Sequence, residues 1–218
     1  MHTGWYDSHM ETRQADLARD RILHAAFGEI HRNGYQAASI ANILADTGLT
    51  KGALYHYFPA KHALGLAVID EVIQAGLEEM VFRPLREAEQ PVTELLDIMQ
   101  RKAEYMIEDT IKLGCPLNNL MQEMSPLDEA FKARLTLILK AWQMAIHNAL
   151  VTGQRQRQIR ADVDCEAAAL FIVSAWEGCW GVAKNMQSVK TFRLCITQLQ
   201  DYVLSLGPRS RSGNKPTR

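Results

Sequence analysis

The sequence predicts an all-α chain of about nine helices, with a small N-terminal domain followed by a larger C-terminal one. Apolar residues recur at helical spacing along most of the chain, and no segment alternates in the way a strand does. A helix-turn-helix pattern lies near the N-terminus. We therefore expect domains over residues 11–60 and 61–206, flanked by disordered segments over 1–10 and 207–218.

The first helix is expected from about Arg13 to Asn33, because its apolar residues share one face. The ten residues before it, MHTGWYDSHM, have no helical period, so we expect them to be disordered. Within them, Ser8-His9-Met10 is also typical of a cloning remnant. Gly34 ends the helix, and Tyr35 returns to the core.

Two short helices joined by a tight turn are predicted next. Ser39 caps the first helix, which ends near Gly48, a residue that readily adopts the left-handed conformation. Thr50 caps the second helix, expected from Lys51 to Tyr57. Leu54 is the single inward-facing anchor of that helix. Its other side chains therefore form an outer face that suits a DNA major groove.

The C-terminal domain is expected to consist of helices over residues 61–82, 91–111, 115–124, 125–156, 164–186 and 188–206. Arg83-Pro84 is expected to break the first of these, and Ser125-Pro126 to cap the fourth. The helix over 164–186 is apolar nearly all round, which indicates that its own domain covers one side and a partner subunit the other. The tail after residue 206 is basic, lacks apolar residues and is expected to be disordered.

The composition restricts the classes of function. With 24 Lys and Arg against 25 Asp and Glu, the formal net charge of −1 argues against a protein that coats nucleic acid by bulk charge. Four cysteines without a C-x-x-C pair, no signal peptide and no long apolar run predict a reduced, cytoplasmic protein. Catalytic motifs and paired Cys/His metal spacings are missing from the sequence. We expect neither an enzyme nor a bound metal or other cofactor.

Residues 13–64 resemble the TetR-type (TetR/AcrR-like) transcriptional regulators. The resemblance rests on Gly34-Tyr35, on Ser39-Ile40-Ile43 and above all on the run KGALYHYFPAK from Lys51 to Lys61. One departure is His62, which stands where the family usually has an acidic residue. The resemblance implies a homodimer that binds a palindromic DNA operator, and a C-terminal domain that binds a small-molecule inducer and dimerises.

The resemblance also implies roles for single residues of the helix-turn-helix. Polar side chains at its positions contact phosphates or base edges, and Gly52 permits close approach of the DNA. Side chains on the outer face read sequence, and the best candidates are Lys51, Ala53 and His56. A role as core aromatics is the alternative for the tyrosines; we accept core packing for Phe58 and reject it for Tyr55. The predicted DNA-binding set is Ser39, Thr50, Lys51, Gly52, Ala53, Tyr55, His56, Tyr57 and Lys61.

Soft and aromatic side chains in the C-terminal helices suggest a pocket for an apolar or aromatic inducer. The candidates are Met80, Met99, Tyr105, Met106, Cys115, Met121, Met124, Trp142, Trp176, Glu177 and Trp180. The alternative is that these residues are plain core. Glu177 either pairs with a ligand or makes an intersubunit salt bridge where Gly178 and Gly181 let two helices approach. Cys115, at a helix start, is either an electrophile or oxidant sensor or an ordinary reduced cysteine.

The functional prediction is a repressor that an inducer releases from its operator. A ligand that favours another arrangement of the C-terminal helices tilts the helix beginning at Lys61 and disturbs the spacing of the two recognition helices. The alternatives are an activator, a ligand-independent regulator of the same fold, or a helical small-molecule-binding protein or enzyme with a vestigial helix-turn-helix.

Overall fold

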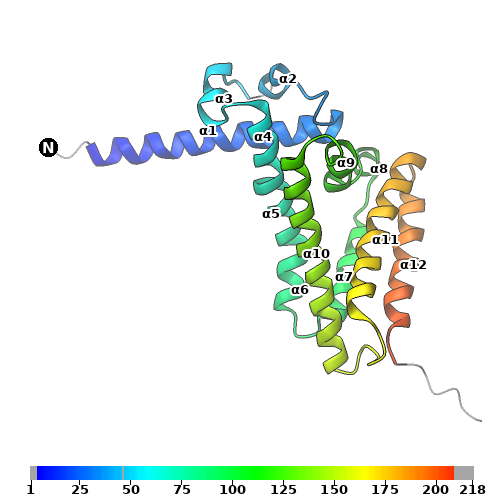
Figure 1. Ribbon diagram of the computed structural model, residues 1–218. Helices are drawn as coiled ribbons and strands as arrows, with labels where there is room; N and C mark the ends of the chain where they lie inside the picture. Colours follow the sequence, from blue (N-terminus) through cyan, green and yellow to red (C-terminus); the bar gives the residue numbers. More distant parts are fainter. Residues whose placement is uncertain (1–3, 46, 209–218) are drawn as a thin grey trace, which may run out of the picture. The chain divides into compact units, whose positions relative to one another are not determined.

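The computed structural model describes residues 4–45 and 47–208, with side chains from residue 16 onward. Over these residues the chain is helical without strands, which confirms the predicted fold class (Figure 1). Its internal contacts divide it into two compact units, the first comprising the chain up to Leu77 with Cys115–Ile138, and the second comprising Glu78–Gly114 with the chain from Leu139 onward. These packing units do not coincide with the sequence-defined domains 11–60 and 61–206.

The first unit holds the helix-turn-helix and the helices packed around it. Its elements are α1 (Gly4–Asn33), α2 (Ile40–Ala45), α3 (Lys51–Tyr57), α4 (Lys61–Ala67), the π-helix η1 (Val68–Ile73), α5 (Gln74–Leu77), α9 (Pro116–Met124) and the start of α10 (Glu129–Arg155). The second unit holds η2 (Glu78–Phe82), α6 (Arg83–Glu87), α7 (Pro91–Glu104), α8 (Glu108–Leu113), the rest of α10, α11 (Cys165–Met186) and α12 (Val189–Ser205).

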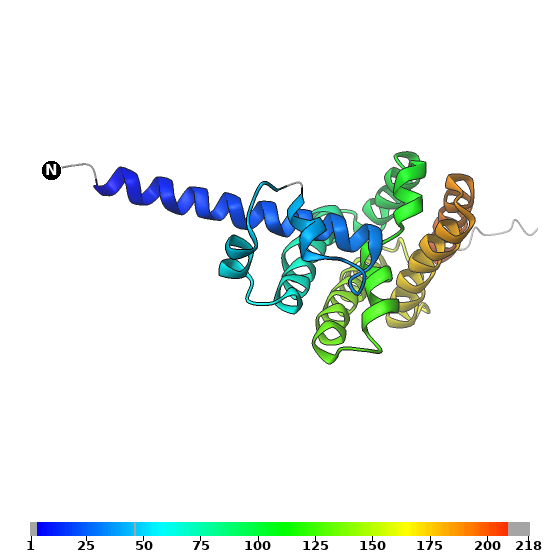
Figure 2. The same cartoon turned by 90° about the horizontal axis from the view of Figure 1, so that it is seen from above.

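The first helix is longer than the sequence predicts. It begins at Gly4 and runs unbroken to Asn33, so residues 4–10 are helical where we expected disorder (Figure 2). Extending an existing helix adds one hydrogen bond for each residue fixed, and no proline interrupts this stretch. Residues 1–3, like 209–218 of the expected tail, lie outside the described residues.

Arg83-Pro84 does not break the helix that begins at Lys61. The chain continues in helical conformation through the two π-helical segments, and Phe82 just before α6 has φ −72° and ψ −47°. Pro84 sits where the π-helical segment passes into α6 and the hydrogen-bonding pattern changes. The helical run therefore ends at Glu87, five residues later than predicted.

The helix expected over 91–111 is two helices. The α7 helix ends at Glu104, and Ile107, with φ −120° and ψ 162°, is extended before α8 begins. Nε of Arg193 on α12 donates a hydrogen bond of 3.0 Å to the carbonyl oxygen of Ala103, which satisfies a backbone acceptor at the end of α7. The break leaves Met106 buried and Tyr105 exposed.

The α10 helix begins at Glu129 and is not capped by Ser125-Pro126. Asp128 is the cap, because its Oδ1 accepts hydrogen bonds from the backbone N–H of Ala130 (2.9 Å) and of Phe131 (3.0 Å). These hydrogen bonds, the one to Phe131 most of all, hold the pKa of the Asp128 carboxyl below its ordinary value. Residues 125–128 therefore form the turn between α9 and α10.

The last two helices pack side by side as an antiparallel hairpin. Asp164 caps α11 and Ser188 caps α12, each by accepting backbone N–H hydrogen bonds. The α11 helix, predicted to be apolar nearly all round, has both buried and exposed apolar side chains. The large exposed ones are Leu170, Phe171, Val182 and Met186, and α12 adds Leu194 and Leu204.

Candidate nucleic-acid interface

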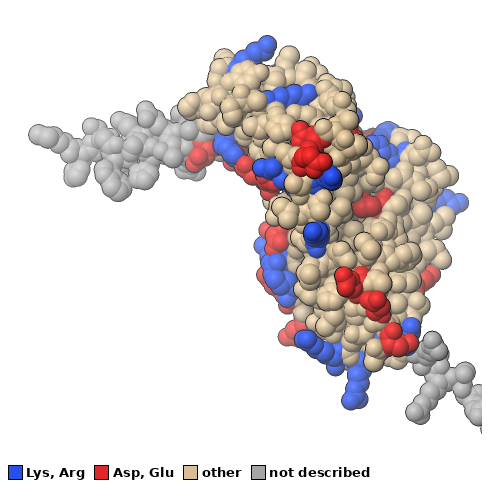
Figure 3. All heavy atoms as spheres, in the orientation of Figure 1, with Lys and Arg blue, Asp and Glu red and all other residues tan. Residues whose placement is uncertain are grey.

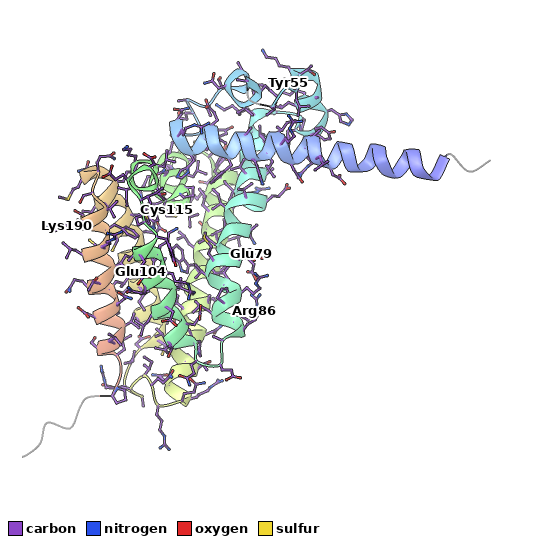
Figure 4. The ribbon with its side chains drawn as sticks, turned by 180° about the vertical axis from the view of Figure 1, so that it is seen from behind. Tyr55, Glu79, Arg86, Glu104, Cys115 and Lys190 are labelled. Atoms are coloured by element: carbon purple, nitrogen blue, oxygen red, sulfur yellow. The ribbon has the colours of Figure 1, made fainter. Side chains whose placement is uncertain are left out.

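The α3 helix matches its predicted limits and has one inward-facing anchor. Thr50 Oγ1 accepts a hydrogen bond of 3.2 Å from the backbone N–H of Ala53 and so caps the helix. Leu54 is fully buried, whereas Lys51, Gly52, Tyr55 and His56 are exposed. Tyr55, 47% exposed, points away from the rest of the unit (Figure 4). Phe58 is buried, as expected for a core aromatic.

The turn before α3 is fixed by hydrogen bonds and by one glycine. Gly48 has φ +65°, the left-handed conformation that the sequence analysis expected. Thr47 is buried; its hydroxyl donates to the carbonyl oxygen of Leu44 (2.9 Å) and accepts from the N–H of Leu49 (3.1 Å). Ser39 Oγ accepts from the N–H of Asn42 at 3.0 Å, which confirms it as the cap of α2.

A buried carboxylate that the sequence analysis missed holds α2 against α1. Glu29 is buried on α1, and its Oε1 accepts hydrogen bonds from Nδ2 of Asn42 (2.9 Å) and from the N–H of Ser39 (3.4 Å). A buried carboxylate requires such partners to be tolerated. A signal existed in the sequence, since Glu29 lies between Ala26 and Ile30 on the apolar face of the first helix.

The charge of this surface suits DNA. The α2 and α3 helices contain no acidic residue, and Lys51 is their one charged side chain apart from His56 when protonated. On the face drawn in Figure 3, the surface over these two helices is basic or uncharged. The overall net charge is −1, so this local arrangement, not bulk charge, would attract phosphate groups.

Lys61 has a role within the protein that the resemblance did not indicate. Its Nζ donates a hydrogen bond of 3.1 Å to the carbonyl oxygen of Gln36 and lies 4.8 Å from the ring centroid of Tyr35. It thus fixes the loop between α1 and α2, and its contact with DNA stays a prediction. Tyr35 in turn packs on Phe131 of α10, with ring centroids 4.6 Å apart.

Glu123, near the end of α9, also binds the loop between α1 and α2. Its two carboxylate oxygens accept hydrogen bonds of 2.8 Å from the backbone N–H groups of Tyr35 and Gln36. Gly34, with φ +83°, lets the backbone come this close, because a Cβ there would lie 3.0 Å from Oε2 of Glu123. No local pattern predicts this contact, since its partners are about 90 residues apart in the chain.

His62 is paired with a residue from the same unit. Its Nε2 lies 2.9 Å from Oδ2 of Asp128, the cap of α10, and its ring packs edge-on against Phe131 at 5.6 Å. His62, which stands where the family usually has an acidic residue, therefore has a carboxylate partner at the start of α10. Gly65, one turn along α4, is packed so closely that a Cβ would lie 2.5 Å from Cε2 of Tyr35.

Substituting Gly52 of α3 is expected to change stability and DNA binding in opposite directions. A Cβ at Gly52 would have 3.7 Å to its nearest neighbour, Oγ1 of Thr50, so the free protein can accommodate it. We expect Gly52→Ala to raise thermal stability, by up to about 1 kcal/mol, because alanine favours helix. We also expect it to weaken operator binding, because the methyl group would lie on the face predicted to approach DNA.

Gly28→Ala on α1 is the matched control for Gly52→Ala. A Cβ there would lie 3.6 Å from the guanidinium of Arg32, ordinary van der Waals contact. This variant should gain stability and keep wild-type operator affinity, measured by calorimetry and by gel shift. Equal operator affinity in the two variants would show that Gly52 is not a close-approach position.

The structure does not bring the predicted pocket residues together within one unit. Cys115, Met121 and Met124 belong to the first unit, and the other eight belong to the second. Met80 and Tyr105, the latter 79% exposed, lie at the surface of the chain. The buried candidates of the second unit are Met99, Met106, Trp142, Trp176, Glu177 and Trp180.

Within the second unit, the buried candidates include a tryptophan pair. The rings of Trp142 and Trp176 meet edge to face with centroids 5.7 Å apart. Trp142 is 1% exposed, and its indole N–H has no hydrogen-bond acceptor among the described residues. Glu177 is only 7% exposed, so its own chain already covers it. That burial favours a position inside the domain over an intersubunit salt bridge.

Among the described residues, no group of three or more His, Cys, Asp or Glu side chains is arranged to hold a metal ion. None of the helices that the structure describes is long and apolar enough to cross a membrane.

Comparison with known proteins agrees with this architecture. The profile described as "Bacterial regulatory proteins, tetR family" matches residues 22–68, and "Tetracyclin repressor-like, C-terminal domain" matches residues 91–199. The transcriptional regulator AcuR of Cereibacter sphaeroides is 30% identical over 166 residues, which cover 75% of each chain. The HTH-type transcriptional repressor DhaR of a Mycobacterium species is 28% identical over 145 residues, 66% of this chain and 71% of DhaR. A crystal structure of regulatory protein TetR from Rhodobacter sphaeroides superposes with a TM-score of 0.77 at 25% identity, covering 85% of this chain and 98% of the other.

Proposed function

This chain belongs to the TetR family of transcriptional regulators, which are DNA-binding proteins and not enzymes, and we propose that it is a repressor released by a small-molecule inducer. In this proposal a cytoplasmic homodimer binds a palindromic operator and blocks transcription. DhaR, a relative of similar length, is named as a repressor.

The observation that carries the DNA-binding proposal is the outer face of α3. Only Leu54 of that helix is buried. The caps at Ser39 and Thr50 stabilise the first turns of α2 and α3, and the buried Glu29 holds α2 against α1. A rigid short helix that presents lysine, tyrosine and histidine side chains suits insertion into a major groove. In this proposal Lys51, Ala53 and His56 contact base edges of the DNA. Thr50, Tyr55 and Tyr57 contact its sugar-phosphate backbone.

The exposed apolar side of the α11–α12 hairpin supports the homodimer. Leu170, Phe171, Val182 and Met186 are each at least half exposed on one helix, a pattern that marks an association surface. Dimerisation would place two recognition helices about one helical turn of DNA, ~34 Å, or a multiple of it apart on a palindrome. A monomer in solution at the concentrations used for DNA binding would contradict this mechanism.

The buried aromatic cluster of the second unit supports an apolar or aromatic inducer. Trp142 and Trp176 supply ring faces, and the cation of Lys102 lies 5.2 Å from the ring centroid of Trp180. The unsatisfied indole N–H of Trp142 favours a ligand that brings a hydrogen-bond acceptor, since a buried donor without a partner costs about 1–3 kcal/mol.

Trp142→Phe tests this assignment. The substitution removes the unpaired donor and keeps an aromatic ring, so we expect the free energy of unfolding to change by less than about 1 kcal/mol as the two effects offset each other. The concentration of inducer needed to release DNA should rise. Val203→Ala, a buried substitution near the end of α12, controls for loosened packing. An unchanged inducer response in Trp142→Phe would remove Trp142 from the proposed pocket.

Coupling between inducer and operator is proposed to run through the helix that begins at Lys61. This helix directly follows the recognition helix, and the loop between α1 and α2 is held by Lys61 and by Glu123 of α9. A ligand that favours another arrangement of these helices would shift the population away from the DNA-competent state.

The experiment that tests the DNA-binding proposal is a binding titration with the DNA flanking the protein's own gene. Scrambled DNA at the same moderate salt is the comparison, because phosphate contacts alone give salt-dependent, sequence-blind affinity. Wild-type protein should prefer the flanking DNA, and Tyr55→Ala should lose that preference. Tyr105→Ala is the matched control, since Tyr105 is exposed in the second unit.

Two further outcomes decide between the alternatives. If neither the flanking DNA nor selection from random sequences yields a preferred site, the regulator function is wrong and a helical ligand-binding protein remains. If a specific site is found, promoter activity after deletion of the gene gives the sign of regulation. A rise fits a repressor, and a fall means an activator.

A further inference from the structure

Two of the four cysteines face each other across the α11–α12 hairpin. The register of this antiparallel pair is set by two ring contacts, Phe171 with Tyr202 and Trp180 with Phe192, each with centroids 4.7 Å apart. Cys179 precedes Trp180, and Cys195 lies one turn beyond Phe192. The two cysteines therefore stand at the same level of the hairpin.

The side chains of these cysteines lie close enough for each to influence the other, and both are free thiols in this structure. Burial first, and then the charge and hydrogen bonding of Cys195, raise the pKa of Cys179 to about 12. Cys179 thus keeps its proton at neutral pH. Cys195 is only half-buried, so it is the sulfur that a small oxidant can reach.

We propose that Cys179 and Cys195 form a redox-active dithiol, which a peroxide closes into a reversible intrachain disulfide between α11 and α12. Cys195 releases its thiol proton, its thiolate attacks one peroxide oxygen and the O–O bond breaks. A sulfenic acid forms, and the departing hydroxide takes up the released proton as water. The sulfur of Cys179 then attacks the Cys195 sulfur. The S–S bond forms, the S–O bond breaks, and hydroxide leaves as a second water with the Cys179 proton.

The other two cysteines are placed differently. Cys115 belongs to the first unit, at the start of α9. Cys165 is in the first turn of α11, about four helical turns from Cys179. Its sulfur lies 3.9 Å from the carbonyl oxygen of Val163. Both can be replaced by serine to leave the proposed dithiol as the only source of a disulfide.

The test uses the full-length chain carrying Cys115→Ser and Cys165→Ser. The reduced protein is treated with one equivalent of hydrogen peroxide, alkylated under denaturing conditions and weighed intact. We expect a product lighter by two hydrogen atoms that takes up no alkyl group, and full alkylation after treatment with dithiothreitol. Adding Cys195→Ser should abolish the loss of two hydrogens, whereas adding Ser174→Ala, on the exposed side of α11, should not.

A peptide map of the wild-type protein keeps the result independent of how these variants fold. Oxidised wild type should yield one cross-linked peptide joining Cys179 and Cys195. The proposal is overturned if the peptides stay separate, if the cysteines gain oxygens without joining, or if the disulfide links two chains on a non-reducing gel. No DNA enters this experiment, so its outcome is distinct from that of the operator titration.

Discussion

Leu54→Ala is expected to abolish specific DNA binding while the second unit stays folded. Leu54 is the one buried side chain of α3, and it is fully covered. Truncating a buried leucine costs about 2–5 kcal/mol through lost burial and the cavity that remains. A helix of seven residues cannot hold its conformation without packing, so most of that loss should appear as local unfolding of the recognition helix.

Denaturant unfolding, hydrogen exchange and operator titration together measure this effect. Amides of α3 should lose protection in Leu54→Ala, and those of α11 and α12 should keep it. The matched control is Leu127→Ala, the same substitution in the same unit at a side chain 62% exposed. Its stability should change by less than about 0.5 kcal/mol. Wild-type operator affinity in Leu54→Ala would refute the single-anchor account of α3.

Glu123→Ala is expected to loosen the loop that carries α2 and α3. It removes the acceptor of two backbone N–H groups, those of Tyr35 and Gln36, each bonded at 2.8 Å. Hydrogen bonds to a charged group contribute about 1.5–3 kcal/mol each when partly buried, so a loss of roughly 2–4 kcal/mol is expected after the loop relaxes into solvent. Operator affinity should fall about tenfold or more, because the loop sets the position of α2.

Two further variants serve as controls for Glu123→Ala. Glu123→Gln keeps an amide oxygen that can accept one of the two N–H groups, so it should lie between wild type and Glu123→Ala. Glu129→Ala removes an exposed carboxylate at the start of α10, whose 3.2 Å pair with Lys132 is at the surface. It should leave both stability and operator affinity close to wild type. If Glu123→Ala behaves like Glu129→Ala, the loop does not depend on α9.

The sequence alone predicts the helix-turn-helix almost residue by residue. The caps Ser39 and Thr50, the left-handed Gly48 and the anchor Leu54 all lie where the local pattern placed them. Each depends on neighbours within four residues along the chain, because caps, turns and helical faces are determined locally. For the same reason the limits of α3, α9 and α12 agree closely with expectation.

Helix ends that depend on distant partners were predicted wrongly. The break after α7 is stabilised by Arg193, about 90 residues further along the chain, whose guanidinium satisfies the carbonyl oxygen of Ala103. Pro84 was expected to end a helix, but it lies where a π-helical segment passes into α6 and the hydrogen-bonding pattern changes. The break after α7 does not follow from residues within one or two turns.

The sequence by itself therefore determined the all-α fold class, the helix-turn-helix and the side chains that face outward from α3. Tertiary structure alone decided how the helix-turn-helix is held in place. Glu123 looks like an ordinary helix-surface carboxylate in the sequence, and the position of Glu29 on an apolar face does not reveal its partners. Each nevertheless accepts two hydrogen bonds from the segment around α2. A carboxylate finds such partners only when the fold brings backbone N–H groups or amide side chains from elsewhere in the chain to it, and no periodicity records that.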